Sequence, residues 1–128
     1  MILLADTHLL LWTALKPHLL SKRARDLIDS EANEPAFSVV SLWEISIKRA
    51  QGRADFRVDP RRLRKRLIEN GWRELLIDGE HAIIAGGLPK IHKDPFDRML
   101  VAQAITEGAR LLTVDSQLEL YGDPVLRV

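Results

Sequence analysis

Short apolar runs recur along the chain, each bounded by a turn or by a polar residue. A short run that is apolar throughout is typical of a strand buried on both faces of a parallel sheet. Four such runs, and one alternating stretch at 72–77, predict four or five strands. They are residues 1–5, 36–40, 72–77, 110–114 and 125–128.

Between these runs the apolar residues follow a helical period. The predicted helices lie in six stretches: a segment reaching Leu15, 21–32, a segment starting at Ser41, one after Asp59-Pro60, 80–87, and 95–107 before Gly108. Strands that alternate with helices form a mostly parallel sheet covered by helices on both faces. The chain has 128 residues, which favours a single α/β domain over 1–128.

The stretch from His92 to Gly108 contains two acids at the start of a predicted helix. Asp94 fits the N-cap, and Pro95 fits the first helical position, where a missing N–H costs nothing. Asp97 falls in the first turn, where the helix dipole stabilises any anion. Capping explains Asp94, whereas Asp97 is also a candidate for chemistry.

Three more acids stand at the ends of predicted elements. Asp6 and Asp115 each follow an apolar strand, and Glu44 lies near the start of a helix whose N-cap we assign to Ser41. Glu44 would then be the capping-box partner of Ser41, although its apolar surroundings also suit a buried carboxylate that binds a cation. In a parallel sheet such ends share one edge, where ligands bind.

Four carboxylates at one edge repel one another unless cations lie between them. Mg²⁺ prefers oxygen ligands and is commonly held by carboxylates together with substrate phosphates. With these four acids set aside, 19 basic residues stand against 14 acids, and the remaining net charge is +5. A basic surface around an acidic site suits a phosphodiester substrate.

Composition removes several other classes of protein. The absence of cysteine excludes disulfides, thiolate zinc sites and cysteine nucleophiles, and it fits a reducing cytosol. The apolar N-terminus lacks a basic leader, and Asp6 and His8 interrupt it, so we expect neither a signal peptide nor a membrane span. No glycine-rich phosphate loop or nucleophile elbow occurs.

Three further features of the sequence each allow two interpretations. The basic stretch from Arg53 to Arg66 is either a solvated helix face, with Leu63, Leu67 and Ile68 turned inward, or a phosphate-binding rim. His92 fits a hydrogen-bonding loop residue better than a ligand or a base. The apolar stretch 9–20, with Trp43 and Ile47 as a second wall, predicts a groove for a partner helix or a homodimer contact.

Four motifs then carry a resemblance to a known family. LLADTHLLLW, SLWEISIK, HKDPFDRMLVAQA and LLTVD, in this order, resemble the PIN domain and in particular the VapC-type toxins of bacterial toxin–antitoxin pairs. The resemblance implies a cytoplasmic ribonuclease dependent on Mg²⁺ or Mn²⁺, a cognate antitoxin and a homodimer. It also implies that the catalytic and metal-binding residues are Asp6, Glu44, Asp97 and Asp115.

Two other functions remain open from the sequence. A non-catalytic nucleic-acid-binding module on the same fold has no need of a repulsive acidic cluster. A haloacid-dehalogenase-like phosphatase needs a second aspartate soon after the nucleophile, but Thr7 and His8 follow Asp6. Both are weaker explanations of the four acids than a nuclease.

Overall fold

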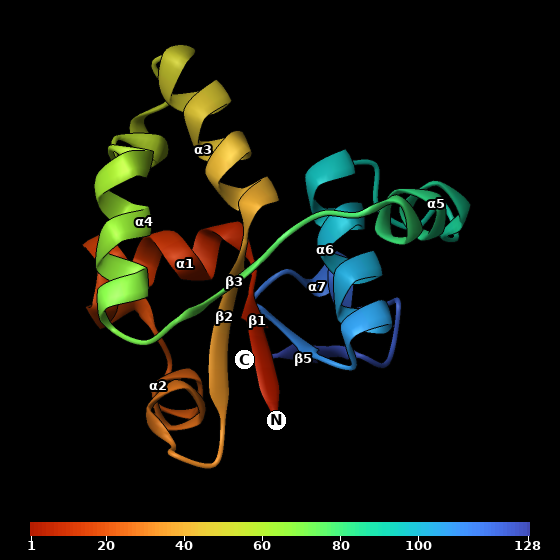
Figure 1. Cartoon of the computed structure of the whole chain (residues 1–128), viewed down its shortest axis with the longest axis horizontal. Helices are drawn as coiled ribbons and strands as arrows, with labels where there is room; N and C mark the ends of the chain where they lie inside the picture. Colours follow the sequence, from red (N-terminus) through yellow and green to blue (C-terminus); the bar gives the residue numbers. More distant parts are fainter.

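Five parallel strands form the centre of the molecule, in the order β3-β2-β1-β4-β5 (Figure 1). The computed structural model describes all residues, 1–128. The strands are β1 Ile2–Ala5, β2 Glu34–Ser38, β3 Arg73–Leu75, β4 Arg110–Thr113 and β5 Val125–Arg127. The predicted class, a parallel sheet of four or five strands flanked by helices, is confirmed.

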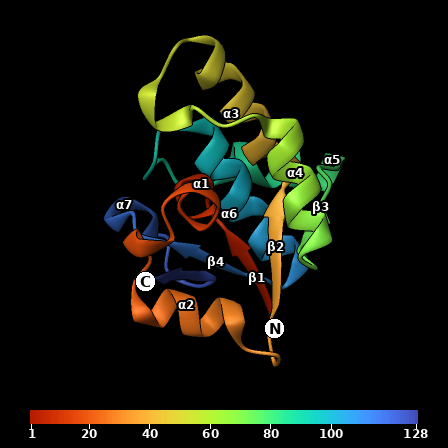
Figure 2. The ribbon, with the colours of Figure 1, turned by 90° about the vertical axis from the view of Figure 1, so that its left-hand side faces the viewer.

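Helices cover both faces of this sheet (Figures 1 and 2). They are α1 Thr7–Leu15, α2 Lys22–Asp29, α3 Val39–Ala50, α4 Pro60–Glu69, α5 Gly79–Gly87, α6 Pro95–Glu107 and α7 Ser116–Glu119, with single 3₁₀ turns η1 Pro17–Leu19 and η2 Ala54–Phe56. In Figure 1, α1, α2 and α4 lie on one side of the strands, and α5, α6 and α7 lie on the other. None of the helices is long and apolar enough to pass through a bilayer.

Strand side chains alternate between two separate cores. Leu3 and Ala5 of β1 pack with the leucines of α1 and α4, whereas Leu4 packs against α6. Because successive side chains of a strand point to opposite faces, an apolar run can fill both cores. This double burial accounts for continuous rather than alternating apolar strands.

Several predicted helix ends are confirmed. Ser21 caps α2 by accepting a hydrogen bond from the N–H of Ala24, and Asp94 caps α6 by accepting one from Phe96. Gly108 ends α6 with φ of 64°, the left-handed conformation that glycine adopts without strain.

The predicted start of α3 is wrong by three residues. Ser38, not Ser41, is the N-cap, because its hydroxyl accepts a hydrogen bond from the Val40 N–H. Val39 and Val40, which favour strands by propensity, form the first turn of the helix instead. Ser41 is buried and accepts a hydrogen bond from the Thr7 hydroxyl at 2.9 Å. Glu44 therefore lies in the second turn and has no capping-box role.

Other boundaries and faces also differ from the prediction. The strand expected at 72–77 is shortened to Arg73–Leu75, and the helix expected at 21–32 ends at Asp29. Ile68 is 45% exposed rather than turned inward, although Leu63 and Leu67 are buried as expected. Two of the basic side chains of α4 pair with acids, Arg64 with Glu74 and Lys65 with Glu69, on a face open to solvent.

The apolar surface expected over 9–20 is largely core. Leu9, Leu10 and Leu20 are buried in the core, so they cannot line a groove, and Leu11 is only 3% exposed. Trp43 is exposed and packs edge-to-face on Phe96 of α6, with ring centroids 5.5 Å apart. It therefore belongs to the α3–α6 contact rather than to a wall facing α1.

Candidate functional site

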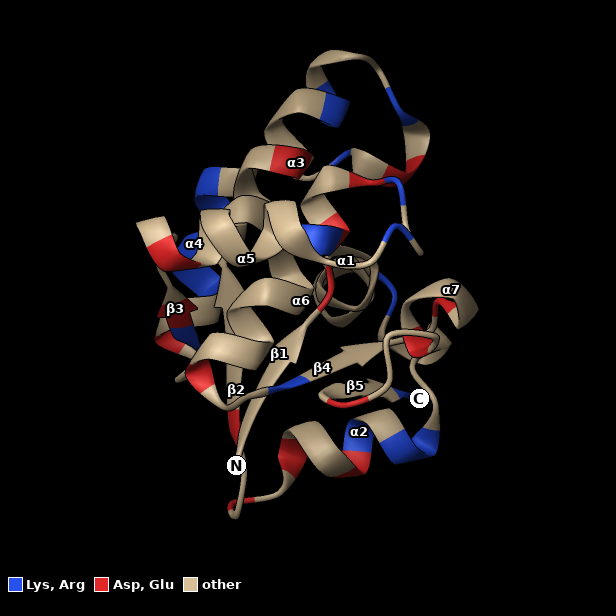
Figure 3. Ribbon diagram, turned by 90° about the vertical axis from the view of Figure 1, so that its right-hand side faces the viewer, with Lys and Arg blue, Asp and Glu red and all other residues tan.

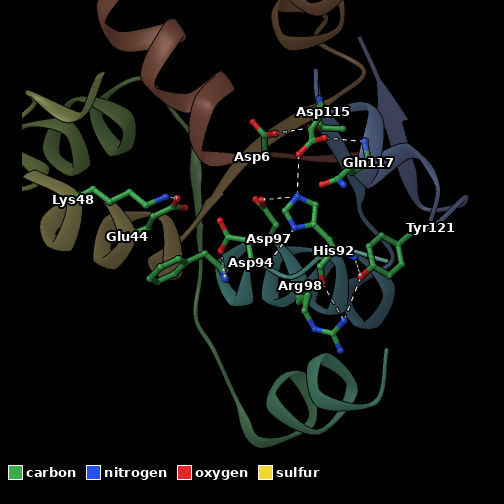
Figure 4. A network of polar contacts seen from close by, with 12 residues as sticks. Asp6, Glu44, Lys48, His92, Asp94, Asp97, Arg98, Asp115, Gln117 and Tyr121 are labelled. Carbon is green, nitrogen blue, oxygen red and sulfur yellow. Dashed lines mark hydrogen bonds and ion pairs between the residues drawn. The ribbon is translucent and has the colours of Figure 1, made fainter. Parts of the chain in front are cut away.

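Asp6, Glu44, Asp97 and Asp115 come together beyond the carboxyl ends of the strands. Figure 3 marks acidic positions in red at the end of β1, in α3 and at the start of α6. Figure 4 shows the four side chains in a close-up view. Asp6 follows β1, Asp115 caps α7 just after β4, and Asp97 lies in the first turn of α6. The topology thus brings residues from four separate elements to one place.

Asp6 is buried and held from two sides. Its Oδ1 accepts the N–H of Leu9 at 2.9 Å, which caps α1, and its Oδ2 accepts the hydroxyl of Thr113 at 2.5 Å. Burial raises the pKa of Asp6 above its ordinary value, and these two hydrogen bonds oppose that rise. Its orientation is therefore fixed by the protein alone.

Thr113 joins the ends of β1 and β4. Its hydroxyl donates to Asp6 and accepts the backbone N–H of Asp115 at 2.9 Å. Asp115 accepts the N–H of Gln117 on Oδ1 and the Nε2 of His92 on Oδ2, at 2.8 and 3.0 Å. Burial tends to raise the pKa of Asp115, but the hydrogen bonds from Gln117 and His92 and the attraction of the His92 ring outweigh it and lower that pKa.

Asp97 is perturbed both by burial and by the acids around it. Its pKa is raised to about 8, first by burial and then by repulsion from the other acids, Asp94, Asp6, Glu44 and Asp115. A carboxyl in that condition binds a proton at neutral pH unless a cation takes the place of the proton. The repulsion from all four neighbours indicates that Asp97 lies within electrostatic range of each of them.

Glu44 has one oxygen paired and one oxygen alone. Its Oε2 contacts the ammonium of Lys48, one helical turn later, whose side chain is only 17% exposed and lies over the ring of Phe56. Its Oε1 is buried without a hydrogen-bond partner. Buried polar atoms are almost always satisfied, so an unpartnered carboxylate oxygen points to a missing ligand.

The donor set therefore fits a hard divalent cation. All four candidates offer carboxylate oxygens, the ligands that Mg²⁺ and Mn²⁺ prefer. The free Oε1 of Glu44 and the raised pKa of Asp97 both describe carboxylates that gain from a cation between them.

Sequence reasoning undervalued His92 and overlooked Lys48. The Nε2 of His92 lies 3.0 Å from Asp115 and 3.4 Å from Asp97, so that its ring stands between the two acids (Figure 4). No local signal indicates this, because Asp115 is 23 residues away. Lys48, in contrast, was detectable from its spacing of four residues after Glu44.

A second group with metal-ligand chemistry has a structural explanation. His81 is buried and completes the capping box of α5: its Nδ1 accepts the N–H of Asp78 at 3.1 Å. Its Nε2 contacts Glu107 at 2.9 Å. Both ring nitrogens are thus engaged, Nδ1 in the cap of α5 and Nε2 in the contact of α5 with α6. A cavity of about 740 Å³ between α3 and α4 likewise contains none of the four acids.

Comparison with known proteins agrees with this architecture. Residues 3–123 match the PIN domain family. Ribonuclease VapC22 of Mycobacterium tuberculosis (strain ATCC 25618 / H37Rv) is 31% identical over 122 residues, which is 94% of this chain and 92% of that protein.

Two solved structures share the fold over nearly their whole length. The structure of VapBC2 from Rickettsia felis, bound to a DNA fragment from its promoter, aligns with a TM-score of 0.71 at 15% identity, covering 100% of this chain and 98% of that one. VapBC-5 from Mycobacterium tuberculosis, of the VapBC family of toxin–antitoxin systems, aligns at 0.64 and 17% identity, covering 99% and 97%. With its matching sequence and its fold, this chain belongs to the PIN domain family.

Proposed function

We propose that this protein is a metal-dependent endoribonuclease and the toxin of a toxin–antitoxin pair. The observation that carries the proposal is the cluster of Asp6, Glu44, Asp97 and Asp115. In this cluster the pKa of Asp97 is raised and Oε1 of Glu44 has no hydrogen-bond partner. Similarity to Ribonuclease VapC22 supports RNA as the substrate, and an RNA substrate in turn supports a cytoplasmic location.

Asp6, Glu44, Asp97 and Asp115 would hold Mg²⁺ or Mn²⁺ and are the proposed catalytic residues. A divalent cation there supplies Lewis-acid stabilisation of the charge that develops on a phosphodiester attacked by water. A cation held there would favour the ionised form of Asp97, because its positive charge would offset the repulsion from the neighbouring acids.

The protein's own residues hold these carboxylates in place before substrate arrives. Thr113 and the Leu9 N–H orient Asp6, and the Gln117 N–H orients Asp115. Fixed groups need little rearrangement when charge develops during a reaction. The surplus of basic residues outside the cluster favours approach of a polyanion.

The test is cleavage of labelled single-stranded RNA with Mg²⁺, with Mn²⁺ and with a chelator. We expect cleavage only with metal, and we expect Asp97→Asn and Asp6→Asn each to abolish it while the protein stays folded, because each removes a charge that holds the cation. Asp26→Asn, at an exposed position of α2, is the matched control.

Two results would contradict the assignment. Full cleavage by Asp97→Asn would show that the site is misplaced. RNA binding without cleavage under every metal condition would favour the non-catalytic binding module.

We also propose a cognate antitoxin and a homodimer as partners, in line with the toxin–antitoxin systems of similar fold. Trp12 and Leu15 of α1 line a small hollow of about 70 Å³ beside η2, and they remain accessible although the neighbouring leucines are core. An apolar antitoxin segment placed there could direct a basic side chain toward the acids. Exposed Trp43 and Ile83 offer further apolar surface for a second copy.

We expect Trp12→Glu to weaken antitoxin binding by about tenfold or more, measured by calorimetry. Ile105→Glu, an exposed apolar position of α6 on the other face of the sheet, is the control and should bind normally. Light scattering checks that both variants keep the oligomeric state of the wild type. Equal affinity of Trp12→Glu and wild type would exclude this hollow.

A further inference from the structure

The segment joining α5 to α6 places an imidazole inside the acidic cluster. The side chain of His92 is only 11% exposed, and its Nε2 faces Oδ2 of both Asp115 and Asp97, at 3.0 and 3.4 Å. These three side chains bring potential ligand atoms within 4.8 Å of one another. His92 could therefore act either as an additional ligand or as a hydrogen-bond donor to Asp115.

The other ring nitrogen distinguishes these roles. Nδ1 of His92 accepts the backbone N–H of Asp94 at 3.1 Å. A neutral imidazole carries one hydrogen, so an accepting Nδ1 requires the hydrogen on Nε2. An Nε2 that carries hydrogen has no lone pair for a metal ion, but it can donate to Asp115 at 3.0 Å, with Asp97 next to it at 3.4 Å.

The backbone that carries His92 is clamped by the residue after Asp97. The guanidinium of Arg98 donates to the carbonyls of Ala85, Leu88 and Pro89, at 2.9, 3.0 and 3.0 Å. One rigid planar group thus gathers three carbonyls at the end of α5 and just beyond it. Arg98 and Asp97 are consecutive residues of α6, so the clamp and the acid move together.

Tyr121 completes the clamp from the C-terminal part of the chain. Its hydroxyl donates to the Pro89 carbonyl at 3.0 Å and accepts the N–H of His92 at 3.1 Å. Figure 4 shows Arg98 and Tyr121 converging below the His92 ring, on the side away from Asp6. The ring is therefore held by the hydrogen bond of the His92 backbone N–H, by the hydrogen bond to its Nδ1 and by the contacts of Arg98 and Tyr121 with the preceding segment.

We propose that His92 is a positioning residue of the nuclease site, which orients Asp115 beside Asp97 through an Nε2–H donor and does not bind the metal. Arg98 and Tyr121 set the place of its backbone, and the Asp94 N–H sets its tautomer. The inference rests on the proposed function for its consequence in catalysis, but the hydrogen position and the effect on metal binding are measurable without it.

The hydrogen position is tested by ¹H–¹⁵N correlation spectroscopy of the histidine rings in the whole protein. The chain has four histidines, and a His92→Gln sample identifies the resonances of His92. We expect a protonated Nε2 and an unprotonated Nδ1, both unchanged after Mg²⁺ is added. Loss of the hydrogen from Nε2 when Mg²⁺ binds would make His92 a ligand and overturn the proposal.

Variants test the role. His92→Leu keeps bulk and removes the donor, whereas His92→Gln retains an N–H donor on a side chain of similar reach. We expect His92→Leu to lower the affinity for Mn²⁺, measured by electron paramagnetic resonance, by about 10–100-fold. We expect it to lower kcat for RNA cleavage by a similar factor. We expect His92→Gln to recover most of both, and Tyr121→Phe to give a smaller loss in the same direction.

His81→Leu is the matched control, because His81 has the same two contacts at its own helix start, in a separate group. It should lower thermal stability but leave Mn²⁺ affinity unchanged. Equal loss in His92→Leu and His92→Gln, or wild-type Mn²⁺ binding in both, would overturn the positioning role. If wild type binds Mn²⁺ and fails to cut RNA, the proposed function fails while these binding results still decide the role of His92.

Discussion

At the scale of single residues, one carboxylate often serves two purposes. Asp6, Asp94 and Asp115 all cap helices by accepting backbone N–H groups. Asp6 and Asp115 also contribute to the acidic cluster, because the helix that each begins starts at the edge of the sheet where strands end. Capping therefore does not argue against chemistry, and each acid needs its own test.

Asp94→Asn tests whether Asp94 is more than a cap. Asn caps a helix about as well as Asp, so the free energy of unfolding should change by less than the ~1 kcal/mol that alanine would cost. Repulsion from Asp94 is the second cause of the raised pKa of Asp97, so its removal should bring that pKa down. We expect RNA cleavage to persist at a similar rate. A loss as complete as that of Asp97→Asn would instead assign Asp94 to the metal site.

At the scale of elements, α3 shows how a shift of one cap changes the role of a residue. With Ser38 as its N-cap, α3 carries Ser41 against α1 and places Glu44 one turn deeper. Glu44 then meets Lys48 on the same face, four residues on, rather than the free N–H groups of the first turn. The helix thus presents a buried carboxylate to the cluster, with one oxygen paired to Lys48 and the other without a hydrogen-bond partner.

Lys48→Met should expose the dependence of α3 on this pair. Removing one partner of a buried ion pair costs about 3–5 kcal/mol, because the remaining charge is left without a partner. Thermal unfolding without metal should show the loss, and added Mg²⁺ should raise the melting temperature more than it does for wild type, because no ammonium then competes for Glu44.

Lys22→Met provides the comparison, since it breaks a pair of the same spacing on the exposed face of α2. Exposed pairs of this kind contribute about 0.3–0.5 kcal/mol. Equal losses in the two variants would show that the Lys48 ammonium is not important for the buried carboxylate.

At the scale of the whole molecule, four acids gather at one site and the rest of the chain carries a net positive charge. The overall net charge of +1 conceals this division. Acids gathered at one edge of the sheet repel one another in the absence of cations, as the pKa of Asp97 shows. The stability of the metal-free protein should therefore depend on pH.

Asp97 sets the direction of that dependence. Its pKa of about 8 in the folded protein exceeds its ordinary value of 3.8, so between these limits the folded state binds more protons than the unfolded state. Stability then falls as pH rises through this window, by about 6 kcal/mol at most. Asp6 acts in the same direction, because its pKa is also raised.

Thermal unfolding of the metal-free protein should thus give a lower melting temperature at pH 8 than at about pH 5. Asp97→Asn should flatten the dependence, and Mg²⁺ should restore the melting temperature at pH 8. A melting temperature that rises steadily with pH in metal-free protein would contradict the raised pKa.

The sequence by itself determined the elements that local patterns encode. Continuous apolar runs gave the parallel strands, and Ser21, Asp94 and Gly108 marked helix ends correctly. The rule that carboxyl ends of parallel strands share an edge was enough to group Asp6 and Asp115, whereas Glu44 and Asp97 reach the same place from within α3 and α6. These predictions succeed because they depend on neighbours in the chain and on regular geometry.

Only the tertiary structure decided which distant side chains meet. Thr7 with Ser41 and His92 with Asp115 are separated by 34 and 23 residues, and no local period encodes such contacts. The same limit explains the leucines of α1, whose apolar pattern fits a binding groove or a core equally well. Packing of α2 and α4 against that helix buried them, because the free energy of removing apolar surface from water depends on what lies opposite.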